Sequence, residues 1–199
     1  ADTDLISKAP HRLNASGCGD LIGKITAIKD WELARDDKNE YFGTYAANLA
    51  QLSAKIITEM PNLSLIKEYE IRTIVEALIS AGVASCIAGS SRPCSGSEHL
   101  FSHALEYVTK DDCGLHGERV GIGTIMMSKL HGMDSEMIIS TLENVSAPTT
   151  AKDIKVNEDD LVDALRIAQS LRPDRYTILT KVKMDNDSAR NLAKSVNVI

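Results

Sequence analysis

The 199-residue sequence lacks several features that mark large classes of protein. It has no basic excess, because 22 Lys and Arg stand against 28 Asp and Glu, and a net charge of −6 does not favour binding to a nucleic-acid backbone. It has no run of 18 uncharged apolar residues and no signal-peptide pattern. We therefore expect no nucleic-acid partner, no membrane insertion and a cytoplasmic location.

Cysteine is also scarce, and its placement predicts reduced thiols rather than a disulfide framework. At 43% hydrophobic and 25% charged residues, the chain can bury the core of one domain. Residues 1–13 begin without Met and read as a connector from an N-terminal domain that we expect to be missing upstream. The four cysteines are Cys18, Cys86, Cys94 and Cys113.

Apolar residues recur at helical spacing along most of the chain, which predicts an all-α domain. Residues 176–182 are the exception, since they alternate as a strand does. Capping residues and prolines place the helix ends. The predicted helices run from about 14 to 33, 45 to Pro61, 65 to 88, 118 to 131, 135 to Pro148, 157 to Pro173 and 187 to 196, and one more carries His99 and His103.

Three of the five histidines lie close together in the sequence. His99 and His103 are four residues apart in a predicted helix, so both imidazoles leave one face, with Cβ atoms about 5–6 Å apart. Gly114 and Gly117 flank His116, which predicts a turn that brings a third imidazole to the same place. Together these residues predict a metal site.

A zinc site needs three or four N, O or S ligands, and a catalytic zinc keeps one position open. Asp20 is the carboxylate that we favour, because it lies in the first turn of a predicted helix beside Gly17 and Gly19, where backbone can approach a ligand closely. The residues alone leave three other carboxylates open: Glu98, Glu106 and Glu118.

Two motifs are misleading, and one alternative zinc site stays open. The glycine run at 17–23 has one residue too many for a dinucleotide loop and no strand ahead of it, so we expect no cofactor-binding residues in this chain. Leu100 stands where a zinc protease helix carries its glutamate base. A closed structural zinc site is the alternative, with the ligands Cys94, His99, Cys113 and His116.

Three segments, SGCGDLIGKITAIKDWELA, SSRPCSGSEHLFSHALEY and GLHGERVGIGTIMMSKLHG, resemble the C-terminal half of the archaeal-type sn-glycerol-1-phosphate dehydrogenases. That family belongs to the superfamily of iron-dependent alcohol dehydrogenases, glycerol dehydrogenases and dehydroquinate synthases. The resemblance covers essentially all 199 residues. It implies a multi-helix bundle over 1–199, the metal- and substrate-binding domain of the dehydroquinate synthase-like fold, without the N-terminal α/β nucleotide-binding domain.

The resemblance also implies the role of each site residue. Asp20, His99 and His116 correspond to the zinc ligands, and Asp20 also contacts substrate. His103 corresponds to the second histidine of the pair, which contacts substrate and is our candidate catalytic residue. The implied reaction interconverts dihydroxyacetone phosphate and sn-glycerol 1-phosphate with NAD(P), for the backbone of archaeal phospholipids. Glycerol dehydrogenase and dehydroquinate synthase are the nearest alternatives.

The implied partners are a small phosphorylated polyol or ketone, the missing N-terminal domain, which would bind NAD(P), and further copies of the chain in a homo-oligomer. We expect this chain alone to be inactive. The substrate phosphate needs cationic partners. Three basic residues lie near the motifs, but we interpret each as a solvated surface charge: Lys24, Arg92 and Arg119.

Overall fold

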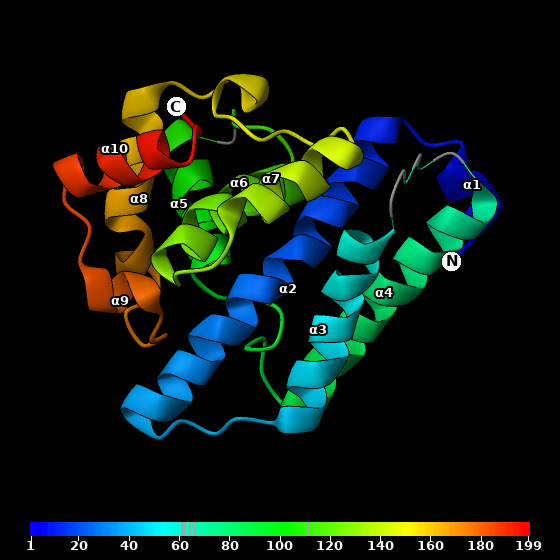
Figure 1. Cartoon of the computed structure of the whole chain (residues 1–199), viewed down its shortest axis with the longest axis horizontal. Helices are drawn as coiled ribbons and strands as arrows, with labels where there is room; N and C mark the ends of the chain where they lie inside the picture. Colours follow the sequence, from blue (N-terminus) through cyan, green and yellow to red (C-terminus); the bar gives the residue numbers. More distant parts are fainter. Residues whose placement is uncertain (61–62, 64, 66, 111) are drawn as a thin grey trace.

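A computed structural model describes residues 1–60, 63, 65, 67–110 and 112–199. Within them every element of regular secondary structure is a helix, which confirms the predicted all-α fold class (Figure 1). The α-helices are α1 (Thr3–Ser7), α2 (His11–Lys38), α3 (Thr44–Glu59), α4 (Glu68–Ala88), α5 (Ser97–Thr109), α6 (His116–Leu130), α7 (Ser135–Asn144), α8 (Glu158–Ile167), α9 (Ile178–Val182) and α10 (Asn186–Ser195), and two short 3₁₀ helices are η1 (Lys152–Ile154) and η2 (Ala168–Leu171).

Helix α2 begins and ends outside its predicted limits. It starts at His11, directly after Pro10, and runs to Lys38, where Asn39 adopts a left-handed conformation with φ 54°. Pro10 suits a helix start because its φ is already fixed and it has no N–H to leave unpaired. The predicted start near residue 14 was therefore wrong, and Asp20 lies well inside the helix rather than in its first turn.

Two other predictions need correction. The segment predicted as a strand, residues 176–182, forms helix α9 over residues 178–182, and the described residues contain no strand with which it could pair. The start of α9 is held by the buried carboxylate of Asp30, which accepts the Ile178 N–H at 2.7 Å. Helix α6 begins at His116 itself, so this histidine opens the helix rather than preceding it. Residues 61, 62, 64 and 66, within or beside the predicted second and third helices, lie outside the described residues.

Helix α2 crosses the middle of the molecule (Figure 1). It packs against α3 and α4 on one side and against α5 and α6 on the other. A small apolar cluster around the buried Trp31 joins α2 to α3 and α4, while a larger core extends from α2 to the C-terminal helices. Most side chains between Leu21 and Ile28 on α2 are therefore buried.

Helix α4 is apolar on its outer face as well as its inner face. By length and composition alone it could cross a membrane, with an 18-residue window of mean hydropathy 1.6 that is 28% buried. Its inner face packs on α3, whereas Ile79, Val83 and Ile87 are 57%, 44% and 50% exposed. An apolar face of this kind is also typical of a protein–protein interface.

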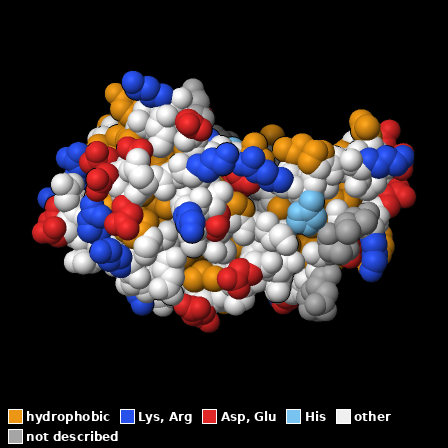
Figure 2. All heavy atoms as spheres, turned by 90° about the horizontal axis from the view of Figure 1, so that it is seen from above, with side chains coloured by type: hydrophobic (Ala, Val, Ile, Leu, Met, Phe, Trp, Pro, Cys, Tyr) orange, Lys and Arg blue, Asp and Glu red, His pale blue; other side chains and the backbone are white. Residues whose placement is uncertain are grey.

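The surface has no large area of one charge on the face seen in Figure 2. Short groups of basic side chains lie there beside acidic ones, separated by polar and apolar residues. This mixed pattern agrees with the small negative net charge of −6.

Candidate metal centre

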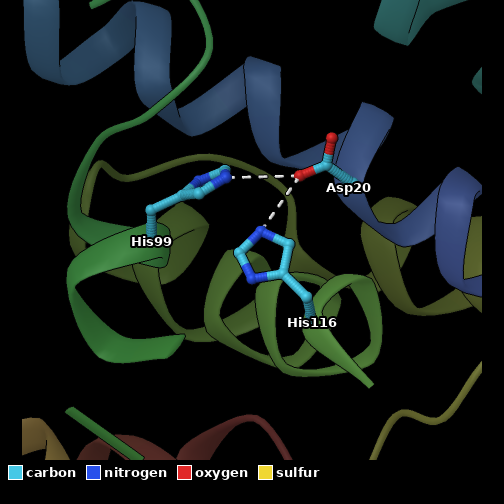
Figure 3. A group of neighbouring side chains, drawn as sticks. All are labelled: Asp20, His99 and His116. Atoms are coloured by element: carbon cyan, nitrogen blue, oxygen red, sulfur yellow. Dashed lines mark ion pairs between the residues drawn. The ribbon is translucent and has the colours of Figure 1, made fainter. Parts of the chain in front are cut away.

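Asp20, His99 and His116 converge from three helices (Figure 3). Asp20 comes from the middle of α2, His99 from the first turn of α5 and His116 from the first position of α6. Asp20 Oδ1 lies 3.2 Å from His99 Nε2 and 3.6 Å from His116 Nε2. In the described part of the chain this is the one group of three or more His, Cys, Asp or Glu side chains with ligand atoms this close, all within 4.8 Å of one another.

Close backbone packing brings Asp20 and His116 together. A Cβ atom placed on Gly19 would lie 2.3 Å from the carbonyl oxygen of Gly117, and one on Gly117 would lie 1.8 Å from the carbonyl oxygen of Ser16. Only glycine fits at either position, so α2 and α6 approach more closely than side chains would permit. The glycines that the sequence placed beside a ligand act here as helix-packing residues.

Helix α2 also fixes the start of α5. Asp30 Oδ2 accepts the Ser97 N–H at 2.6 Å, while Oδ1 accepts the Ile178 N–H and lies 3.1 Å from His131 Nε2. Asp30 is completely buried, so this carboxylate takes the place of water as the acceptor for the first N–H groups of α5 and α9. Because Ser97 opens α5, the same contact sets where His99 emerges.

Glu98 orients the imidazole of His99. Its Oε1 lies 2.8 Å from His99 Nδ1 and accepts the Gly96 N–H at 2.7 Å, and its Oε2 accepts the Thr26 hydroxyl at 2.8 Å. Burial alone would raise the pKa of Glu98, but the contacts from His99 and Gly96 hold it below the usual range. Glu98, one of the candidate ligands, therefore lies behind His99, where a carboxylate directs the other ring nitrogen toward a metal.

Asp20 is held as a carboxylate. Burial alone would raise its pKa, but hydrogen bonds with His116 and His99 and the charge of Lys24 hold the pKa of Asp20 far below its usual value. Lys24 Nζ lies 2.8 Å from Oδ2, which leaves Oδ1 facing the two histidines. Burial would lower the pKa of His99, but Asp20 and Glu98 raise it, so the cluster favours positive charge beside Asp20.

The third histidine of the predicted group lies beside the cluster rather than in it. The ring centroid of His103 lies 6.5 Å from that of His99 and 6.0 Å from that of His116. Its side chain is half exposed, and its Nδ1 lies 3.7 Å from Glu106 Oε2. Burial, followed by the charges of His99 and His116, lowers the pKa of His103, which favours the neutral imidazole.

The three basic residues interpreted as solvated surface charges are buried, so that prediction was wrong. Lys24, Arg92 and Arg119 are 3%, 5% and 5% exposed. Arg92 pairs with Glu40, and Arg119 lies 3.2 Å from Glu106 Oε1. The charges of Arg92 and Arg119 are matched by carboxylates on other elements of the fold, which spacing in the sequence could not show. Lys24 alone contacts the metal cluster.

The alternative ligands lie elsewhere. Cys94 donates its thiol to the Ala81 carbonyl at 3.0 Å, and Cys113 lies 3.7 Å from the Arg119 guanidinium. All four cysteines are free thiols, and the closed two-cysteine, two-histidine site is not formed in the described residues. Glu118 pairs with Arg12 instead of facing the histidines.

No protein-family model matches the chain. Curated proteins do match it from end to end. It is 57% identical over 198 residues to glycerol-1-phosphate dehydrogenase, NAD(P)+, of Nitrosopumilus maritimus, 50% over 199 residues to the protein of that name from Aeropyrum pernix, and 49% over 200 residues to that of Pyrococcus horikoshii. Each match covers 100% of this chain but only 56–58% of the relative. The chain thus spans a little over half the length of these relatives.

Two solved structures share the fold. A probable glycerol dehydrogenase from Sinorhizobium meliloti superposes with a TM-score of 0.75 at 18% identity, over 98% of this chain and 57% of that one. Sulfoacetaldehyde reductase from Bifidobacterium kashiwanohense, solved with NAD+, superposes with a TM-score of 0.69 at 17% identity, over 98% and 53%. At these identities the likeness concerns the arrangement of helices.

Proposed function

We propose that the chain belongs to the glycerol-1-phosphate dehydrogenase family, whose name its relatives carry, and that it is the zinc- and substrate-binding part of such an enzyme. The enzyme would interconvert dihydroxyacetone phosphate and sn-glycerol 1-phosphate with NAD(P), as the family resemblance implies, and the names of its relatives support glycerol 1-phosphate and NAD(P)+. One observation carries the proposal: Asp20, His99 and His116, which correspond to zinc ligands in the family resemblance, have converging ligand atoms.

Residues 1–199 would form the helical domain of this enzyme. The relatives are longer, and we place the NAD(P)-binding domain in the part of their length that this chain does not cover. Ile79, Val83 and Ile87 on the outer face of α4 would then be covered by that domain or by another copy of the chain, since water is a poor neighbour for a continuous apolar face.

The donor set fits zinc. One carboxylate oxygen and two imidazole nitrogens are three ligands of the kinds that catalytic zinc sites use, and such sites leave a further position for substrate or water. Zinc bound there would supply Lewis acidity toward a ketone oxygen. Asp20 stays ionised through its contacts with His116, His99 and Lys24. Glu98 keeps Nε2 of His99 turned toward Asp20, so both side chains are oriented in advance.

His103 would serve the chemistry rather than hold the metal. A neutral imidazole beside the cluster can hydrogen-bond a substrate hydroxyl and hold or return a proton at the substrate oxygen. Its position one helical turn beyond His99 places it on the same face of α5. His103 and Asp20 are therefore our proposed substrate contacts on this chain.

Metal analysis of four proteins tests the ligand set. After dialysis, the wild-type chain should retain about one zinc, while His99→Ala and His116→Ala should lose it. His11→Ala, which removes an exposed imidazole at the start of α2, is the matched control and should behave as wild type. Equal zinc in all four proteins would exclude the proposed ligands.

Substrate assays test the reaction class. The complete two-domain enzyme should reduce dihydroxyacetone phosphate with NADH or NADPH and should be far less active on glycerol. Turnover of glycerol in preference to glycerol 1-phosphate, or of the dehydroquinate synthase substrate, would move the protein to another branch of the superfamily.

A further inference from the structure

A cavity of about 320 Å³ lies beside the metal cluster. It opens between α2, α4, the loop before α5, and His99, and among the described residues that line it Asp20 is the one acidic residue. Three serines, Ser85, Ser91 and Ser95, also line it. The volume lies within the range of about 300–1,000 Å³ that is usual for small-molecule sites.

Lys24 brings a buried ammonium group to this cavity. Its side chain is only 4% exposed, and in the described part of the chain its one hydrogen-bond partner is Asp20, at 2.8 Å from Oδ2. An ammonium has three N–H donors. Burying a lysine with donors still free is costly unless an acceptor from the cavity completes the shell.

Arg175 adds a second buried positive charge behind the cavity wall. It is 9% exposed, and its Nη1 donates to the Ser95 carbonyl at 2.6 Å while its Nη2 donates to the Ser91 hydroxyl oxygen at 2.9 Å. No carboxylate among the described residues lies within ion-pair distance of this guanidinium. Because Ser91 already accepts from Arg175, its own O–H remains available as a donor.

We propose that this cavity is the phosphate subsite of the substrate, with Lys24 as the charged donor and Ser91 as a hydroxyl donor polarised by Arg175. The inference rests on the proposed function, in which the substrate carries a phosphate. Lysine binds phosphate as a point charge, and the two cations, Lys24 and Arg175, outnumber the one carboxylate in the lining, so the cavity favours an anion. A substrate with its oxygen at the histidines and its phosphate here would be held at both ends.

Calorimetric binding to the complete, zinc-loaded enzyme without cofactor tests the subsite with three probes: sn-glycerol 1-phosphate, glycerol and inorganic phosphate. Lys24→Met should lower the affinity for glycerol 1-phosphate and inorganic phosphate by roughly 10- to 100-fold, as expected for loss of a hydrogen bond to a charged group. The affinity for glycerol should stay within about twofold of wild type. Lys29→Met, which removes an exposed lysine from the same helix, is the matched control and should change nothing.

Ser91→Ala provides a second variant, because Ser91 does not touch the metal cluster. It should weaken phosphate binding by roughly 2- to 10-fold, with zinc content unchanged. If Lys24→Met releases zinc, the phosphate affinity of Ser91→Ala decides whether the subsite exists. Any one of three results would overturn the subsite. Ser91→Ala could bind glycerol 1-phosphate and inorganic phosphate as wild type does, or a zinc-loaded Lys24→Met protein could lose affinity for glycerol and glycerol 1-phosphate equally. The third is a wild-type enzyme that binds neither glycerol 1-phosphate nor inorganic phosphate.

The same experiment separates the subsite from the proposed function. If the enzyme turns over dihydroxyacetone phosphate but Lys24→Met and Ser91→Ala bind it as wild type does, the reaction stands and the subsite falls. If inorganic phosphate binds through Lys24 while no dehydrogenase activity is found with either nicotinamide cofactor, the subsite stands and the reaction falls.

Discussion

Gly19 and Gly117 lie backbone to backbone where α2 crosses α6, so that a Cβ on Gly19 would come within 2.3 Å of the Gly117 carbonyl oxygen. Asp20 follows the first glycine and His116 precedes the second, and their side chains meet with Oδ1 3.6 Å from Nε2. The geometry of the cluster is thus set by helix packing. A change in the spacing of the two helices would move two proposed ligands at once.

Alanine at this crossing should therefore damage both stability and metal binding. We expect Gly19→Ala to lower the free energy of unfolding by roughly 1–3 kcal/mol, the usual cost of overpacking, and to weaken zinc binding. Gly17→Ala is the matched control on the same helix, because its Cβ would sit an ordinary 3.7 Å from Leu78 and alanine favours a helix over glycine by about 1 kcal/mol. Urea unfolding and zinc titration measure both effects. Equal behaviour of the two variants would show that the crossing tolerates side chains.

The sequence was informative where function depends on local spacing. Histidines four residues apart on a helix and a histidine between glycines predicted that three imidazoles approach one another, and their ring centroids lie 5.2–6.5 Å apart. What it could not supply was how deeply each charge is buried. Lys24 is buried because Asp20 is one turn away and the surrounding helices enclose both, and enclosure is a tertiary property.

The strand prediction for 176–182 failed for a related reason. Alternation of apolar side chains describes one segment, whereas a strand needs a neighbouring strand to complete its hydrogen bonds. Asp30, far away on α2, instead accepts the N–H that begins α9. Similarly, Glu98 is adjacent to His99 in sequence, but its role depends on Thr26 and Gly96, which only the fold brings to it.

Glu98→Gln should weaken zinc binding without removing a ligand. Glutamine fills the same space but loses the negative charge that holds His99 Nδ1–H, and loss of such a supporting carboxylate costs about 10- to 100-fold in metal affinity. Competition with a chelator of known zinc affinity measures the change. Glu136→Gln, on the exposed first turn of α7, is the control and should bind zinc as wild type does. A Glu98→Gln protein with wild-type affinity would show that His99 is oriented by other contacts.

His103→Ala should separate metal binding from chemistry within one helix. We expect the complete enzyme to keep its zinc and its cofactor affinity, while kcat/KM falls by roughly 10²- to 10⁴-fold, the usual contribution of a general acid or base. His99→Ala should lose both zinc and activity. Metal analysis and steady-state kinetics on the same preparations make the comparison. Release of zinc by His103→Ala with retention by His99→Ala would mean that the two roles are exchanged.

The ion pair between Arg12 and Glu118 should make stability depend on pH. Glu118 is buried, and its two carboxylate oxygens lie 2.6 and 2.7 Å from Arg12 Nε and Nη2, while the Leu115 N–H donates to it at 2.7 Å. Burial alone would raise the pKa of Glu118, but these donors hold it below its usual value. The folded state therefore gains stability above the ordinary glutamate pKa of about 4.3 and loses it as pH falls through the lower folded-state pKa.

Glu118→Gln should consequently lower the free energy of unfolding by about 1–2 kcal/mol at pH 7, a modest value because Arg12 is 61% exposed and solvent screens its charge. The difference from wild type should shrink toward zero as pH falls well below about 4, where the unfolded and folded glutamate are both protonated. Arg12→Met should follow the same trend, since it removes the other half of the pair. Urea unfolding at several pH values between 7 and 3 measures the dependence. A difference between Glu118→Gln and wild type that stays constant across this range would assign the stabilisation to the shape of the α6 cap rather than to charge.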